Sequence, residues 1–141
     1  MTLNERGDNM WFYNYTTGVL TRDQITNFVR ITWVNLGKDS ELLRYRVYDW
    51  SNGTPILFKE DLVQLDPSEG KTSDIEIASS IYGDSLDIKL YEVRLSIIHQ
   101  CNTIVNIFGI SDTGIINLGN TVLYSQLVPI YIIECCHRRQ F

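Results

Sequence analysis

Residues 25–34 read ITNFVRITWV, and this stretch indicates the class of fold. Its apolar side chains recur at every second position, at Val29, Ile31 and Trp33. Successive side chains of a β-strand point to opposite faces of the sheet, whereas an α-helix repeats its apolar face every three to four residues. The stretch is therefore expected to form a strand with one buried face.

The same alternation continues through most of the chain. Further strands are expected at residues 43–50, 56–58, 62–65, 71–77, 90–98, 103–110, 115–118 and 121–134. Turn-forming clusters at residues 35–40, 51–55 and 66–70 separate them. The charged triplet Lys59-Glu60-Asp61 is expected to be a corner between two short strands, and residues 78–84 to hold a single helical turn. We predict an all-β fold, an antiparallel β-sandwich of jelly-roll or immunoglobulin-like type.

The composition is that of one globular domain. The chain has 141 residues, of which 44% are hydrophobic and 21% charged, so it can bury a core without added staples. Residues 10–15 read MWFYNY, an aromatic cluster that ends before the regular alternation begins. We therefore expect an N-terminal aromatic arm over residues 1–24, which is either a first strand or a docking segment. A sandwich domain with a Cys-Cys tail is expected over residues 25–141.

The charge pattern and the length of the apolar runs indicate which classes of partner are not expected. The formal net charge is −5 and the basic residues are scattered, so nucleic acid is not an expected partner. The longest apolar stretch, near residues 128–133, is too short to span a bilayer, and no membrane association is expected. The first residues are polar and mixed in charge, so no signal peptide is expected.

The chain contains no recognisable catalytic motif. Its glycines lie singly at turns, and His99 and His137 are the only imidazoles available for a triad or a metal site. Glu76 and Glu92 alternate with apolar neighbours and are expected to be solvated, not paired for acid–base chemistry. No enzymatic activity, cofactor or metal is predicted.

Three cysteines, Cys101, Cys135 and Cys136, leave at least one thiol without a partner in the same chain. Adjacent residues in a strand point to opposite faces, so one of Cys135 and Cys136 would face outward. The thiols could be buried as small apolar groups, or form disulfides between chains. Metal binding together with His137 is a third reading, although zinc sites normally space their cysteines by two to four residues.

The aromatic residues are the candidate contact residues. Tyr48 and Trp50 are expected on the face that carries Arg44 and Arg46, and three more aromatic residues lie near the N-terminus: Trp11, Phe12 and Tyr13. Trp, Tyr and Arg are the residues that most often anchor interfaces. The alternatives are that these side chains pack within the fold, or that they form a platform on which a sugar stacks.

Two groups of segments carry a family resemblance. Residues 29–37 (VRITWVNLG), 45–50 (YRVYDW), 65–67 (LDP) and 91–95 (YEVRL) resemble immunoglobulin-like and fibronectin-like modules of bacterial surface proteins. Residues 103–114 (TIVNIFGISDTG) and 120–130 (NTVLYSQLVPI) resemble endospore appendage subunits and exosporium proteins of spore-forming Firmicutes.

The resemblance implies a structural subunit that assembles with copies of itself into a helical fibre by strand augmentation. It also implies cross-linking by Cys101, Cys135 and Cys136, and a spore-surface location reached without a signal peptide, from the mother-cell cytoplasm. Appendage subunits carry their cysteines in an N-terminal connector, whereas the adjacent pair here is near the end of the sequence, so the cross-linking register does not carry over. A carbohydrate- or receptor-binding module is the alternative function.

Overall fold

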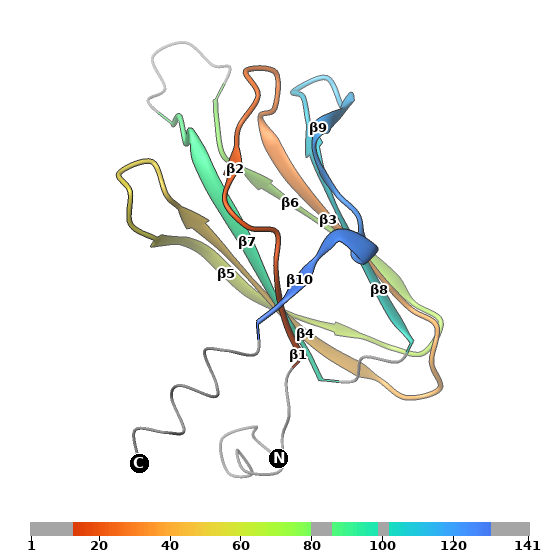
Figure 1. Ribbon diagram of the computed structural model, residues 1–141. Coiled ribbons are helices and arrows are strands. Elements are labelled where there is room, and N and C mark those ends of the chain that lie inside the picture. The colour runs from red at the N-terminus through yellow and green to blue at the C-terminus, as the bar shows by residue number, and fades with distance from the viewer. Residues whose placement is uncertain (1–12, 80–85, 99–101, 131–141) are drawn as a thin grey trace, which may run out of the picture.

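The computed structural model describes residues 13–79, 86–98 and 102–130, which form two antiparallel β-sheets packed face to face (Figure 1). The strands are β1 (Tyr13–Thr16), β2 (Leu20–Thr21), β3 (Phe28–Asn35), β4 (Glu41–Asp49), β5 (Ile56–Leu65), β6 (Gly70–Glu76), β7 (Leu90–Ile97), β8 (Thr103–Ile110), β9 (Ile116–Val122) and β10 (Val128–Pro129). A single 3-10 turn, η2 (Tyr124–Gln126), precedes β10. The all-β class and the sandwich-like pair of antiparallel sheets are confirmed.

The chain passes repeatedly from one sheet to the other. Sheet A has the strand order β10-β1-β7-β4-β5, with β2 also paired to β7, and sheet B has the order β6-β3-β8-β9. The turns after β4 and β8 make hairpins within a sheet, whereas the connections β3–β4, β5–β6, β6–β7 and β7–β8 cross between sheets. Among the described strands, the edges of sheet A are consequently β5 on one side and β10 and β2 on the other, and those of sheet B are β6 and β9.

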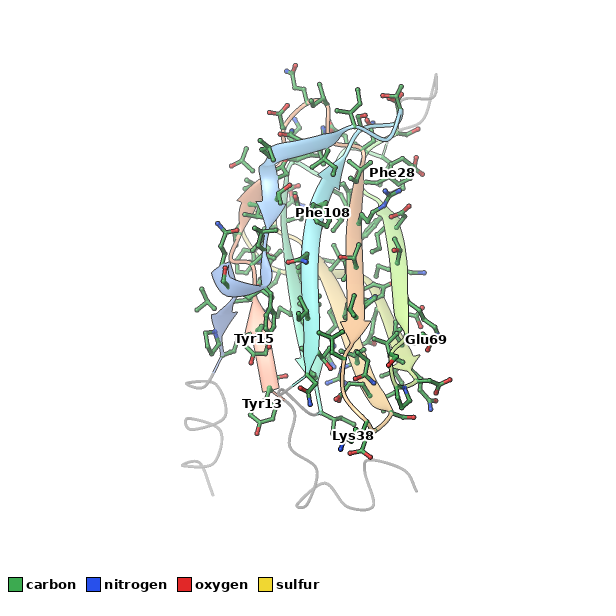
Figure 2. All side chains as sticks on the ribbon, turned by 90° about the vertical axis from the view of Figure 1, so that its right-hand side faces the viewer. Tyr13, Tyr15, Phe28, Lys38, Glu69 and Phe108 are labelled. Atoms are coloured by element: carbon green, nitrogen blue, oxygen red, sulfur yellow. The ribbon has the colours of Figure 1, made fainter. Side chains whose placement is uncertain are left out.

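Alternate residues of the central strands fill the space between the sheets, as their pattern predicts. Trp33 of β3 and Leu43 of β4 are fully buried, and the Trp33 ring packs against that of Tyr45 with centroids 6.0 Å apart. On the opposite face of sheet B, Phe28 and Phe108 extend from neighbouring strands (Figure 2). Burial of large apolar side chains of this kind is the main favourable contribution to folding.

A buried asparagine fixes the turn between β3 and β4. The side chain of Asn35 is 1% exposed, and its Nδ2 donates to the carbonyl oxygens of Asp39, at 2.8 Å, and of Leu65 and Asp66, both at 3.3 Å. Its Oδ1 accepts a hydrogen bond from the Gly37 N–H at 2.9 Å. This side chain therefore ties the turn to the end of β5 and supplies the bonds that a buried amide requires.

The prediction of two short strands around a corner at Lys59-Glu60-Asp61 is wrong. The structure has one continuous strand, β5, in register with β4 from Glu41 opposite Leu65 to Asp49 opposite Ile56. Because β5 is an edge strand, its charged side chains reach water without a break in the ladder. A bulge interrupts the register between Lys59 and Leu57, where Phe58 is the extra residue.

The prediction of one long strand over residues 121–134 is also wrong for the part that the structure describes. β9 ends at Val122, η2 follows at Tyr124–Gln126, and the chain then joins sheet A as the two-residue β10. The reason is that this segment changes sheets, and Pro129 has no N–H to donate to a longer ladder.

The predicted aromatic arm is in part a component of sheet A. Tyr13–Thr16 pairs with residues 94–97 of β7, and Leu20 and Thr21 pair with Tyr91 and Leu90. Residues 1–12 lie outside the described part of the chain. Ala78 makes an isolated bridge with Asp87, and most of the predicted helical turn at 78–84 also falls outside the described residues.

Candidate functional site

The outer face of sheet A carries a row of arginines. Arg44 and Arg46 of β4 point away from the core, as their alternation predicts, and Arg94 of β7 lies directly opposite Arg46 in the antiparallel register. Arg44 lies opposite Ser96 of β7 on one side and Leu62 of β5 on the other. Cross-strand neighbours on one face lie about 5 Å apart at Cβ, so the register gathers three guanidinium groups.

Carboxylates and an aromatic ring hold two of these arginines in place. Arg46 Nε pairs with Glu60 Oε2 of β5 at 2.5 Å, and Arg94 Nε pairs with Glu92 Oε2 at 3.0 Å. The Arg94 guanidinium also lies over the Tyr48 ring, 4.4 Å from its centroid, in a cation–π contact. The side chains therefore form an ordered row of alternating positive and negative charge, in which the Tyr48 ring packs against the Arg94 guanidinium.

Glu92 is buried, contrary to the solvated position expected from its alternation. It is 6% exposed, and it accepts hydrogen bonds from Trp50 Nε1 at 2.9 Å, from Arg94 and from the Thr16 hydroxyl. Burial acts to raise the pKa of Glu92, but these hydrogen bonds outweigh it and hold the pKa below the usual value for glutamate. The expectation fails because neighbouring side chains cover the outer face of a sheet at this position.

A cavity of about 240 Å³ lies beside the arginine row. The described residues that line it are Asn14, Arg44, Arg46, Arg94, Leu95, Ser96 and Ile130, none of which is acidic. The Ser96 hydroxyl donates to Asn14 Oδ1 at 2.7 Å, which orders the polar wall. Burial, and then the neighbouring charge of Arg46, lower the pKa of the Arg44 guanidinium, so positive charge is crowded here and an anion would be stabilised.

Next to the arginine row, the β5 edge exposes large apolar side chains. Ile56 is 53% exposed, Leu57 49%, Phe58 38% and Leu62 55%. β5 is hydrogen-bonded to β4 and to no other described strand, and it forms one lateral border of sheet A (Figure 1). An exposed, long and apolar edge strand is a template for pairing with another chain.

A larger cavity of about 630 Å³ lies among the connections at the end of the sandwich near Arg22. The Arg22 guanidinium donates to the carbonyl oxygens of Ile88 at 2.8 Å and Thr26 at 3.1 Å, and it pairs with Asp87. These contacts join the segment before β3 to the segment before β7, so Arg22 has a structural role. Sequence reasoning missed it because Asp87 and the Ile88 carbonyl lie far away along the chain.

The structure brings together only some of the predicted contact residues. Tyr48 and Trp50 both lie on the outer face of sheet A, where each is partly buried against Arg94 or Glu92. Tyr13 is 41% exposed and lies on β1, at the end of the sandwich that also holds the turn with Lys38 (Figure 2). The other predicted residues lie outside the described part of the chain: Trp11, Phe12, Cys101, Cys135 and Cys136.

Within residues 13–79, 86–98 and 102–130, no three His, Cys, Asp or Glu side chains are grouped as a metal site requires. In the same ranges, no helix is long and apolar enough to cross a membrane. Comparison of the chain with family models, curated proteins and solved structures gave no match.

Proposed function

We propose that this chain is a structural subunit that assembles with copies of itself by β-strand augmentation, and that it catalyses no reaction. The observation that carries the proposal is β5, a ten-residue edge strand that exposes Ile56, Leu57, Phe58 and Leu62. Strand addition at such an edge supplies main-chain hydrogen bonds, and the apolar side chains add buried area.

The other described edges are less suited to pairing. β10 has two residues and includes Pro129, which cannot donate a ladder hydrogen bond. β6 places Lys71 toward the inner side of its edge, where the ammonium group donates to the Gln64 carbonyl at 2.8 Å. Charges that point inward protect an edge against addition. β9 pairs irregularly with β8, so its outer side is not a regular ladder.

The strand pairing agrees only in part with the immunoglobulin-like description of the fold. β3 pairs with β6 in one sheet, while β4 pairs with β5 and β7 in the other, as strands B–E and C′–C–F do in variable-type immunoglobulin domains. β8, however, pairs with β3 and not with β7, whereas the strand that follows F lies beside F in those domains. The spore-surface fibre is therefore proposed from the resemblance to spore appendage and exosporium proteins together with the β5 edge. Cross-linking by Cys101, Cys135 and Cys136 would then reinforce the joints, and synthesis in the mother cell would need no signal peptide.

The proposal is tested by the mass and appearance of the purified protein over a range of concentrations. Light scattering after gel filtration and negative-stain electron microscopy, with and without reductant, are expected to show oligomers or fibres. Leu57→Lys combined with Leu62→Lys is expected to abolish them, because two charges would be buried at the joint. Ile25→Lys is the matched control, since Ile25 is as exposed as Leu62, at 55%, and lies between β2 and β3. Wild-type monomers under every condition would contradict the proposal.

A ligand-binding module is the second candidate, and the cavity beside the arginine row favours it. Arg44, Arg46 and Arg94 line this cavity together with the polar side chains of Asn14 and Ser96. Guanidinium groups beside neutral hydrogen-bonding groups suit an acidic sugar. Calorimetric titration with glucuronate and with glucose is expected to show binding of the acid alone, which Arg94→Gln weakens and Arg30→Gln, on the other sheet, does not. Equal heats for both sugars would contradict this candidate.

A further inference from the structure

The direction of the backbone groups of β5 determines how a second chain can pair with it. The Leu62 N–H donates to the Asp61 carboxylate at 2.8 Å, and the Gln64 carbonyl accepts from Lys71 Nζ at 2.8 Å. Neither group is therefore used by β4. Main-chain groups alternate in direction along a strand, so the outward-facing set belongs to Glu60, Leu62 and Gln64, while Asp61 and Val63 bond to β4.

Two residues of opposite charge flank Glu60, the first residue of the outward-facing set. Lys59 precedes it and Asp61 follows it, and both side chains are exposed at the rim of the sheet. We propose, resting on the self-assembly proposed above, that two copies of this chain pair antiparallel through β5, about a two-fold axis at Glu60. In that register Lys59 of each copy lies opposite Asp61 of the other, and opposite charges across a ladder attract.

The central pair and its neighbours fit the same register. Glu60 lies opposite Glu60 of the second copy, and each carboxylate is already paired with its own Arg46, so the four charges balance. Leu62 of each copy lies beside the β-bulge at Phe58 of the other, which covers two exposed apolar side chains at each end of the joint. The Gln64 carbonyl already accepts a hydrogen bond from Lys71 Nζ, so the segment of β5 that pairs with the second copy ends before Gln64.

Pairing also exchanges one hydrogen bond for another. In the single chain the Asp61 carboxylate accepts from the Leu62 N–H and so satisfies an edge donor. In the pair that N–H donates to the backbone of the second copy, and the carboxylate turns to the opposite Lys59. The charged centre of β5 therefore favours the register centred on Glu60 over other registers. Only in this register does Lys59 of each copy face Asp61 of the other.

Charge reversal tests the register. Lys59→Asp places two acids opposite each other, and Asp61→Lys places two lysines opposite each other, so each variant alone is expected to raise the dissociation constant at least tenfold. An equimolar mixture of the two variants restores both ion pairs in a heterodimer, and the double variant restores them in a homodimer. Sedimentation equilibrium gives the masses, and circular dichroism melting checks that each variant folds.

Lys38→Asp is the control for net charge, because Lys38 is exposed in the β3–β4 turn, which contacts the Leu65 end of β5 and not its centre at Glu60. It is expected to associate as the wild type does. If both single variants associate like the wild type, or if their mixture stays monomeric, the two-fold register is overturned while self-assembly stands. If the wild type itself is monomeric at millimolar concentration, the proposed function is overturned and the pairing with it.

Discussion

Gly109 has no room for a side chain. A Cβ built on Gly109 would lie 2.5 Å from Asn120 Cβ and 3.0 Å from Thr26 Oγ1. Asn120 cannot retreat easily, because its Oδ1 accepts from Thr26 Oγ1 and from the Asp23 N–H, each at 2.8 Å, and its Nδ2 donates to the Thr21 carbonyl at 2.8 Å. The glycine of β8 therefore leaves room for a buried polar cluster that joins Asn120 of β9 to the segment before β3.

Gly109→Ala is accordingly expected to destabilise the fold by roughly 1–3 kcal/mol, the usual cost of forcing atoms into a packed site. Urea denaturation of the wild type and the variant measures the difference. Ser125→Ala, at an exposed position in η2, is the control and is expected to change stability by less than about 0.5 kcal/mol. An unchanged midpoint for Gly109→Ala would mean that the cluster yields without cost.

Glu92 makes stability depend on pH. Its pKa in the folded chain lies below the unfolded value of about 4.3, so its ionised form stabilises the fold above that value. This stabilisation is lost as the pH falls through the folded-state pKa. Glu92→Gln is therefore expected to cost roughly 1.5–3 kcal/mol at pH 7, the range for hydrogen bonds to charged groups, and much less at pH 3.

Urea denaturation at pH 7, 5 and 3 measures this loss. Glu76→Gln is the matched control, because Glu76 is an exposed residue of β6. A cost of Glu92→Gln that stays the same at all three pH values would show that shape, and not charge, is what this site requires.

At the scale of the element, the central strands and the edge strand β6 were predictable, whereas the edge strands β5 and β9 were not. The patterns at residues 90–98 and 103–110 match β7 (Leu90–Ile97) and β8 (Thr103–Ile110), since one face of each is buried and the alternation is complete. β5 was divided in two, because at an edge most positions are exposed and period two disappears. An alternating apolar pattern arises because one face of the strand is buried, so the pattern disappears in a strand that buries few of its residues.

The direction of the β5 backbone leads to a prediction with proline. Leu62→Pro removes an N–H that faces away from β4, and it is expected to cost about 1 kcal/mol or less in folding while abolishing association. Val63→Pro removes an N–H directed toward Leu43 of β4, and it is expected to cost roughly 1–3 kcal/mol. Thermal unfolding and light scattering measure the two effects. Undiminished association of Leu62→Pro would exclude this edge as the joint.

At the scale of the whole molecule, the sequence showed the composition of the candidate site but not its assembly. Tyr48, Trp50 and the two arginines of β4 could be named together because they lie on one strand. Their partners Glu92, Arg94 and Glu60 come from β7 and β5, and only the strand order brings them close. Edge status is likewise a property of the folded sheets, so no local pattern could identify β5 as an exposed edge.

The placement of the edges also decides what can be built. β5 is an edge of sheet A, and Lys71 of β6 bonds to it from the neighbouring edge of sheet B. β9 is the opposite edge of sheet B. A two-fold joint at β5 is closed, so it makes pairs. Growth into a fibre then needs a second contact elsewhere, and β9, with Leu118 exposed, is the apolar edge available among the described residues.

Amide hydrogen exchange of β5, followed residue by residue at low and high protein concentration, reports whether this strand is the joint. If it is, the Glu60 and Leu62 amides become at least tenfold more protected as the protein associates, because their N–H groups then donate to a second chain. Association that leaves these two amides exchanging at an unchanged rate would contradict the claim that β5 is the joint.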